Sequence, residues 1–90
     1  MPVITEKIKI QNKLGLHARP AALLVQTASK YLAKIEFETD EIKVNGKSIM
    51  GVMMLAAAYG SIITVIADGE DAEESVAGIR ALIESKFDEE

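Results

Sequence analysis

The residues best suited to chemistry form one short segment, Gly15 to Ala22, which contains the only histidine of the chain, His17. Arg19 follows two positions later, and Pro20 comes next. The apolar spacing predicts that a helix begins here, and a helix start offers unpaired N–H groups and positive potential to an anion. Imidazole is a nucleophile near neutral pH, and a guanidinium can hold phosphate oxygens with several donors. The segment therefore predicts a histidine that accepts and hands on a phosphoryl group.

Apolar residues at strand and helix spacing predict the elements that position this segment. Strands are expected over residues 4–10, 34–39, 42–44 and 62–67, and helices over 18–31, 49–57 and 72–86. Gly60 is expected to cap the second helix. The core-facing positions of the first and last helices are Ala21, Leu24, Val25, Ala28 and Leu32, then Ala72, Val76, Ile79, Ile83 and Phe87.

The order βαββαβα predicts an α+β fold, a two-layer open-faced β-sandwich in which three helices cover one face of a four-stranded, mostly antiparallel sheet. Charged residues alternate with apolar ones along the strands, so we expect the other face of the sheet to lie in water. Ninety residues suffice for a single domain, residues 1–90, with one thin core and a site at the surface.

Composition excludes several classes of function. The net charge is −4 and there is no basic run, so nucleic acid is not expected as a partner. The absence of cysteine excludes disulfides and thiolate metal sites, and we expect neither a metal nor a cofactor. The longest apolar run, Ile49 to Tyr59, is too short to span a bilayer, and no leader is visible. The sequence thus predicts a cytoplasmic, monomeric protein with no membrane insertion.

A second segment of interest follows the break at Asn45-Gly46-Lys47. Ser48 is placed to cap the helix over 49–57, since serine is among the preferred N-caps. A short helix that is apolar on more than one side must leave part of itself exposed in so small a domain, unless Met53 or Met54 fills an irregular core. One stripe of this helix holds Ile49, Val52, Met53 and Ala56, whereas Met50, Met54 and Ala57 point elsewhere.

Together, the segments Gly15 to Ala22 and Asn45 to Met53 closely resemble the HPr family, the histidine-containing phosphocarriers of the bacterial phosphotransferase system. The resemblance extends over the whole chain and implies a phosphoryl carrier that is not itself an enzyme. It implies that His17 accepts the phosphoryl group at Nδ1 from phospho-enzyme I and donates it to enzyme IIA domains for sugar uptake. It also implies that Arg19 stabilises the phosphate.

The resemblance further implies regulation and docking. In many family members the corresponding serine is phosphorylated by a dedicated HPr serine kinase/phosphorylase, so Ser48 is both a helix cap and a candidate phosphoserine. A transcriptional regulator is a further candidate partner. The expected partner-binding residues beside the active histidine are Leu16, Ala18, Ile49, Met50 and Met53. Leu16 can instead belong to the packing of the loop.

Other interpretations stay open. The first helix carries Gln26 and Ser29 where many family members have lysines, and the acidic tail Phe87 to Glu90 resembles the nitrogen-related regulatory branch. Lys47 to Gly51, in contrast, matches the sugar branch. A phosphohydrolase would need a general base, and neither segment holds a carboxylate. A noncatalytic interaction domain would explain the exposed apolar helix but not the histidine–arginine pair.

Overall fold

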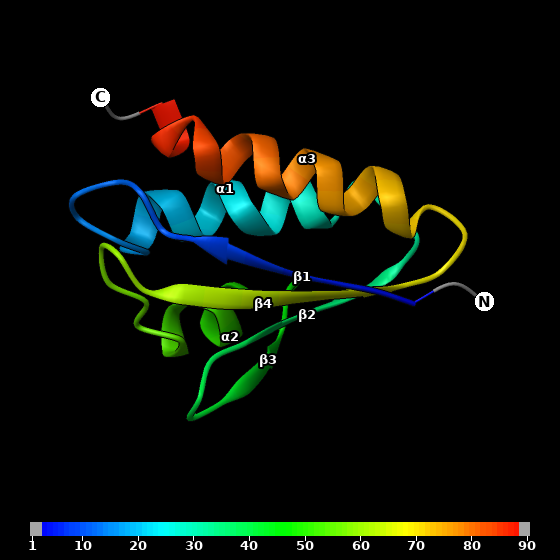
Figure 1. Ribbon diagram of the computed structural model, residues 1–90, viewed down its shortest axis with the longest axis horizontal. Helices are drawn as coiled ribbons and strands as arrows, with labels where there is room; N and C mark the ends of the chain where they lie inside the picture. The colour runs from blue at the N-terminus through cyan, green and yellow to red at the C-terminus, as the bar shows by residue number, and fades with distance from the viewer. Residues whose placement is uncertain (1–2, 89–90) are drawn as a thin grey trace.

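The computed structural model describes residues 3–88, and its elements follow the order that the apolar spacing predicts (Figure 1). In chain order they are β1 (Val3–Lys9), α1 (Ala18–Ala28), β2 (Lys34–Glu38), β3 (Lys43–Asn45), α2 (Ile49–Met54), β4 (Ile62–Asp68), α3 (Ala72–Glu84) and the 3-10 turn η1 (Lys86–Asp88). The order βαββαβα is therefore confirmed. Within this range no helix is both long and apolar enough to cross a membrane.

The four strands form one sheet in the order β1-β4-β2-β3, and each neighbouring pair is antiparallel. β4 lies inside the sheet, where Thr64 is opposite Lys7 of β1 on one side and Glu38 of β2 on the other. The strand expected over 62–67 is thus confirmed, and it has a neighbour on both sides. Alternate residues of β4 are buried in the core: Ile63, Val65 and Ala67.

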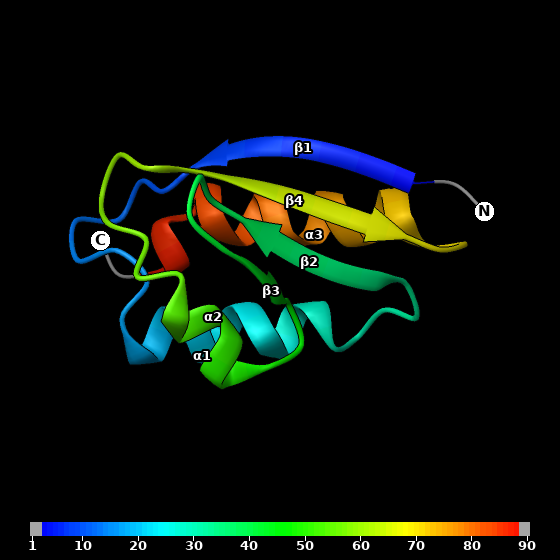
Figure 2. The ribbon, with the colours of Figure 1, turned by 90° about the horizontal axis from the view of Figure 1, so that it is seen from below.

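The three helices lie on one face of the sheet, and the opposite face is open (Figure 1, Figure 2). α1 and α3 pack against each other, α3 also packs on β1 and β4, and α2 lies between α1 and β3. The predicted open-faced sandwich is thus confirmed. The fully or nearly fully buried positions of α1 and α3 include Ala21, Leu24, Ala28, Ala72, Val76, Ile79 and Ile83.

The ends of the helices differ from those expected. α1 ends at Ala28, so Leu32 does not continue its core stripe and is 90% exposed. α2 ends at Met54, and Gly60, with φ +85°, lies in the turn before β4 instead of capping that helix. α3 ends at Glu84, yet Phe87 is buried as predicted because η1 turns the chain back toward the core.

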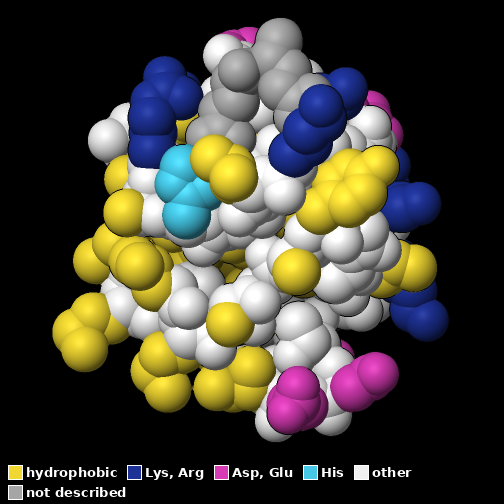
Figure 3. All heavy atoms as spheres, turned by 90° about the vertical axis from the view of Figure 1, so that its left-hand side faces the viewer, with side chains coloured by type: hydrophobic (Ala, Val, Ile, Leu, Met, Phe, Trp, Pro, Cys, Tyr) yellow, Lys and Arg dark blue, Asp and Glu magenta, His cyan; other side chains and the backbone are white. Residues whose placement is uncertain are grey.

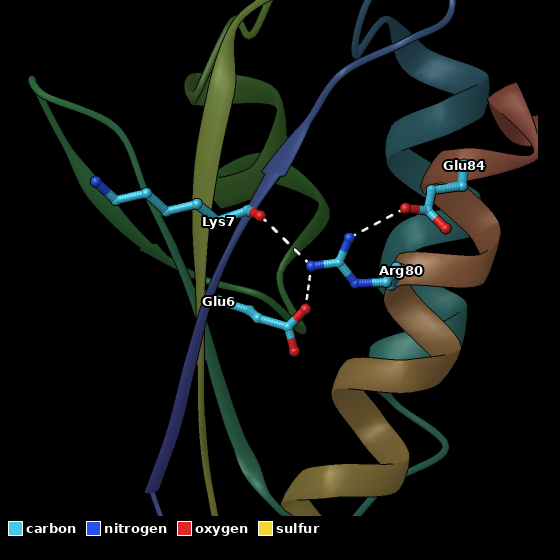
Figure 4. A network of polar contacts seen from close by, with 4 residues as sticks. All are labelled: Glu6, Lys7, Arg80 and Glu84. Carbon is cyan, nitrogen blue, oxygen red and sulfur yellow. Dashed lines mark hydrogen bonds and ion pairs between the residues drawn. The ribbon is translucent and has the colours of Figure 1, made fainter.

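A polar contact ties α3 to the edge strand β1 (Figure 4). Arg80 of α3 pairs with Glu6 of β1 and with Glu84 one helical turn away, the second at 3.0 Å between Nη1 and Oε2. The hydrogen bond with Glu6 raises the pKa of Arg80. The pair explains why a glutamate stands on the helix-facing side of β1. Because these side chains are more than a third exposed, the contribution to stability is small, about 0.5 kcal/mol.

The carboxylate of Asp71, just before α3, determines how the chain leaves α1. It accepts hydrogen bonds from the N–H groups of Leu32 and Ala33, both at 2.8 Å. Lys47 donates from Nζ to the carbonyl of Tyr31 at 2.7 Å. These bonds draw residues 31–33 away from the helical path, which explains the early end of α1. The hydrogen bond from Leu32 lowers the pKa of Asp71.

Asp71→Asn should remove a pH-dependent part of the stability. Because the folded pKa is lowered, the carboxylate stabilises the fold fully above the ordinary aspartate pKa of about 3.9, and this contribution is lost as the pH falls through the folded value. Urea unfolding from about pH 7 to about pH 2 should show that the unfolding free energies of wild type and Asp71→Asn differ at neutral pH and converge in acid. Asp40→Asn, in the exposed β2–β3 turn, is the control. Its unfolding free energy should depend on pH in the same way as that of wild type. A constant gap between wild type and Asp71→Asn would contradict this role.

Candidate functional site

His17 is the N-cap residue of α1. Its backbone is extended (φ −77°, ψ −173°), and its carbonyl accepts the N–H of Ala21 at 3.0 Å, which opens the helix. Its own N–H donates to the carbonyl of Gly15 at 3.0 Å. The imidazole makes no capping bond to α1, and the residue is partly exposed. The ring therefore stands at the surface at the start of a helix, where the sequence predicts it.

The loop before His17 is fixed by contacts with the segment after α2. The N–H of Leu16 donates to the carbonyl of Ala57 at 2.9 Å, and the side-chain amide of buried Asn12 donates to the carbonyl of Gly15 at 2.8 Å. Gly15 has φ +69°, and a Cβ placed there would lie 2.6 Å from the Ala57 oxygen. Only glycine fits this position, because both the backbone angle and the space exclude a side chain.

The first turn of α1 has the features of an anion site. Helix geometry leaves the N–H groups of Ala18 and Arg19 without a partner inside the helix, and Pro20 has no N–H to offer. No acidic residue lies in this turn, so no carboxylate opposes a bound phosphate there. Pro20 is fully buried and therefore serves the packing as well as the helix start. Ala18 and Arg19 are exposed.

The guanidinium of Arg19 lies against the C-terminal turn. Its Nη1 donates to the backbone carbonyl of Phe87 in η1 at 3.4 Å. The sequence predicts Phe87 only as a core residue, and the part that its carbonyl takes in the site was missed. No sequence signal could have found it, because the two residues are far apart in the chain and the acceptor is a backbone atom.

Ser48 is the N-cap of α2, as predicted. Its hydroxyl oxygen accepts the N–H of Gly51 at 3.1 Å, and its backbone is extended. Of the stripe of Ile49, Val52, Met53 and Ala56, only Val52 is buried, and Leu55 and Ala57 after the helix are buried with it. The outward-facing residues, which we call the α2 patch, are Ile49, Met50, Met53 and Met54, with exposed fractions of 42%, 74%, 44% and 63%. The expectation that this helix leaves an apolar side exposed is therefore confirmed, and the alternative that Met53 or Met54 fills an irregular core is excluded.

The α2 patch and the imidazole lie at the same end of the molecule. Figure 3, in which the only histidine is cyan, shows hydrophobic side chains gathered beside and below it. Figure 2 shows α2 alongside the first turns of α1. Leu16 is only 5% exposed and packs in the core, so the loop-packing alternative holds for it and a direct partner contact does not.

A family model described as the PTS HPr component phosphorylation site matches residues 4–85. The chain belongs to the HPr family. As a member of this family it is a phosphocarrier protein of the phosphotransferase system, and the resemblance of its two segments is confirmed.

Individual relatives cover nearly the whole chain. The phosphocarrier protein HPr of Treponema pallidum is 43% identical over 88 residues, 98% of this chain and 100% of the relative. A crystal structure of HPr from Thermoanaerobacter tengcongensis matches with a TM-score of 0.90 and 53% identity, covering 100% and 99% of the two chains. The HPr-like protein Crh of Bacillus subtilis is 42% identical over 84 residues, 93% of this chain and 99% of the relative. A solved structure of that Crh, described as a domain-swapped dimer, matches with a TM-score of 0.74, covering 92% and 95%.

Gly15→Ala should disturb the site, and Gly60→Ala supplies a matched control. Both glycines have a positive φ, but a Cβ at Gly60 meets nothing within 4 Å. Gly60→Ala should therefore cost only the conformational strain, about 1 kcal/mol of unfolding free energy. Gly15→Ala adds a clash with the Ala57 carbonyl and should cost roughly 3 kcal/mol. Urea unfolding measures the difference, and slower phosphoryl labelling should appear only in Gly15→Ala. Equal losses of unfolding free energy in the two variants would contradict the role of the close approach between Gly15 and the Ala57 carbonyl.

Proposed function

We propose that His17 carries the transferable phosphoryl group of this phosphocarrier. The group comes from phospho-enzyme I and goes to enzyme IIA domains in the cytoplasm, in the service of sugar uptake. The observation that supports this proposal best is the placement of the only imidazole of the chain at the surface, on the first turn of α1. That turn supplies two N–H groups without helical partners, and it carries the exposed Arg19.

The chemistry asked of these residues is nucleophilic substitution at phosphorus. The lone pair of Nδ1 attacks phosphorus, the bond from phosphorus to the donor atom of enzyme I breaks, and its electron pair stays with the donor. Negative charge on the three phosphoryl oxygens is stabilised by the helix start and by the guanidinium of Arg19. Donation to an enzyme IIA domain repeats the step with His17 as the leaving group.

A carrier must keep its phosphoryl group from water between partners. The first turn of α1 has no acidic residue that would act as a general base. This favours a carrier over a phosphohydrolase. Incubation with phosphoenolpyruvate and enzyme I separates the two, since a carrier ends with stoichiometric, acid-labile label and a hydrolase releases inorganic phosphate.

The docking surface that we propose consists of Ala18 and the α2 patch. Thioether side chains are flexible and polarisable, which suits a surface that must bind several unrelated partners in turn. Enzyme I, the enzyme IIA domains and a serine kinase would share it. Ser48 lies directly before the patch and is partly exposed, so a kinase seated there would reach its hydroxyl.

Phosphorylation of Ser48 is proposed as the regulatory signal. Similarity to Crh as well as to HPr supports a regulatory role, with a transcriptional regulator as reader of the signal, and the nitrogen-related branch is the alternative assignment of that role. The hydroxyl oxygen that accepts the N–H of Gly51 remains an acceptor in a phosphoserine, so the fold is kept. The added charge lies on the docking surface and repels a phosphorylated partner.

His17→Ala should abolish labelling by phospho-enzyme I and leave the circular dichroism spectrum unchanged, because the ring does not cap α1. Arg19→Ala should leave labelling stoichiometric but slow it by roughly 100-fold or more, since one charged donor to developing phosphoryl charge is lost. Labelling time courses with radioactive phosphoenolpyruvate measure both. Stoichiometric label on His17→Ala would overturn the proposal.

Met50→Glu should weaken binding to enzyme I at least tenfold, because it buries an unpaired charge in the interface. Leu32→Glu is the matched control, since Leu32 is also highly exposed but lies four residues beyond the C-terminal end of α1. Both changes should alter the unfolding free energy by about 0.5 kcal/mol or less. Calorimetric titration with enzyme I gives the affinities. A similar loss of affinity in both variants would place the docking surface elsewhere.

Ser48→Asp should slow phosphoryl transfer from enzyme I, whereas Ser48→Asn, which caps a helix equally well without a charge, should transfer like wild type. Because the proposed cause is repulsion between charges, rising salt should reduce the difference in transfer rate between Ser48→Asp and wild type. Transfer rates from about 0.02 M to about 0.5 M salt test this. A gap that does not change with salt would show a steric or conformational block instead.

A further inference from the structure

We propose that Asn12 is a positioning residue for phosphoryl transfer, because its buried side-chain amide keeps the peptide between Gly15 and Leu16 in the orientation that presents His17. The inference deepens the proposed function and rests on the role that His17 has there. Asn12 lies before the segment Gly15 to Ala22, and its amide acts on a backbone atom and not on the phosphoryl group.

Asn12 is an unusual residue to bury. Among residues 3–88 the fully buried polar side chains are those of Asn12 and Ser75, both 0% exposed. The burial of Ser75 has a local explanation, since its hydroxyl donates to the carbonyl of Ala72 in the same helix at 2.7 Å. Asn12 lies in the loop between β1 and α1, outside any helix or strand. Burying an amide costs free energy unless its hydrogen bonds are made, so the contacts of Asn12 indicate its role.

The peptide between Gly15 and Leu16 is held at both of its polar ends. Its carbonyl accepts the side-chain amide of Asn12 at 2.8 Å and also the N–H of His17 at 3.0 Å. Its N–H, which belongs to Leu16, donates to the carbonyl of Ala57 at 2.9 Å. The N–H of Gly15 closes the turn on the carbonyl of Asn12 at 3.1 Å. Figures 1 and 2 both show the two loops side by side at one end of the molecule.

A peptide that follows glycine depends on such contacts. Gly15 has φ +69°, and it has no Cβ that would oppose rotation of the peptide after it. Rotation would turn the Gly15 carbonyl away from the N–H of His17 and would change the direction in which the chain enters α1. Of the two donors to this carbonyl, the N–H of His17 moves with the chain, whereas the amide of Asn12 is held in the interior. Asn12 therefore determines the orientation of the peptide.

The position of the imidazole depends on this orientation. His17 is the N-cap of α1, and its N–H is bonded to the carbonyl that Asn12 holds. Without the amide, the folded chain samples conformations in which the ring and the first N–H groups of α1 are not aligned for transfer. Only the aligned fraction reacts, so the rate of transfer falls with that fraction. Loss of one hydrogen bond to a buried carbonyl should reduce the rate about tenfold.

Asn12→Leu tests the donor directly, because it removes the amide and keeps a side chain of similar size. The initial rate of labelling by phospho-enzyme I, divided by the folded fraction from circular dichroism, should be about tenfold below that of wild type. In NMR relaxation dispersion, the N–H resonances of Leu16 and His17 should show exchange between conformations in the variant and not in wild type. A residue that serves only stability changes the folded fraction, so a wild-type rate per folded molecule would overturn the inference.

Asn12→Asp adds a pH profile that depends on the donor. Burial raises the pKa of a carboxyl group, so the new carboxyl is protonated in mild acid and donates to the Gly15 carbonyl. At higher pH it is ionised and can only accept. The labelling rate should therefore approach that of wild type near about pH 5.5 and fall about tenfold below it near about pH 8.5.

Asn45→Asp is the matched control. Asn45 is exposed, and its side-chain oxygen already acts as an acceptor, for the N–H of Lys47 at 2.9 Å. An exposed carboxyl is ionised throughout this pH range, so the rate of the control relative to wild type should not change with pH. The pH dependence of enzyme I itself cancels in these ratios.

The inference and the proposed function fail in different ways. A labelling rate of Asn12→Asp that is reduced equally at every pH would overturn the inference alone, because the donor would then play no part. Absence of label on His17 in wild type would overturn the proposed function and the inference together.

Discussion

The presentation of His17 depends on one backbone contact, the hydrogen bond from the N–H of Leu16 to the carbonyl of Ala57. It joins the loop before α1 to the segment after α2, and it forms only because Gly15 brings no Cβ toward the same oxygen. With Leu16 held in the core, the next residue must begin the helix, and its ring is left at the surface. The helix start and the proposed nucleophile are therefore placed together by the same constraint.

The size of the domain explains why the site is built in this way. The core is filled by the inner face of the sheet and by the inward sides of the helices, so the candidate nucleophile, His17, lies on the rim. A site on the rim is accessible to large protein partners, and that is what a carrier between two proteins requires. The surrounding groups are mostly backbone atoms: the first N–H groups of α1, the Ala57 carbonyl and the Phe87 carbonyl. Backbone groups held by packing need no reorganisation when the phosphoryl group arrives.

Local signals in the sequence predicted the starts of the helices, and distant contacts decided their ends. The starts at His17 and Ser48 were predictable because a capping residue and the turn that follows it are neighbours in the chain. The end of α1 was not, because the carboxylate of Asp71 captures the N–H groups of Leu32 and Ala33 from far along the chain. The contact of Arg19 with η1 was hidden for the same reason. The residue types of the site were thus foreseeable, and its hydrogen-bond partners were not.

The most direct test of the central claim locates the phosphorus atom in the loaded protein. The chain, labelled with nitrogen-15, is loaded with phosphoenolpyruvate and enzyme I and examined by phosphorus and nitrogen NMR. The account predicts one phosphoryl group per chain, bonded to Nδ1 of His17, with the resonances of the first turn of α1 shifted by the new charge. Phosphorus bonded to any other side chain, or release of inorganic phosphate without a labelled imidazole, would contradict it.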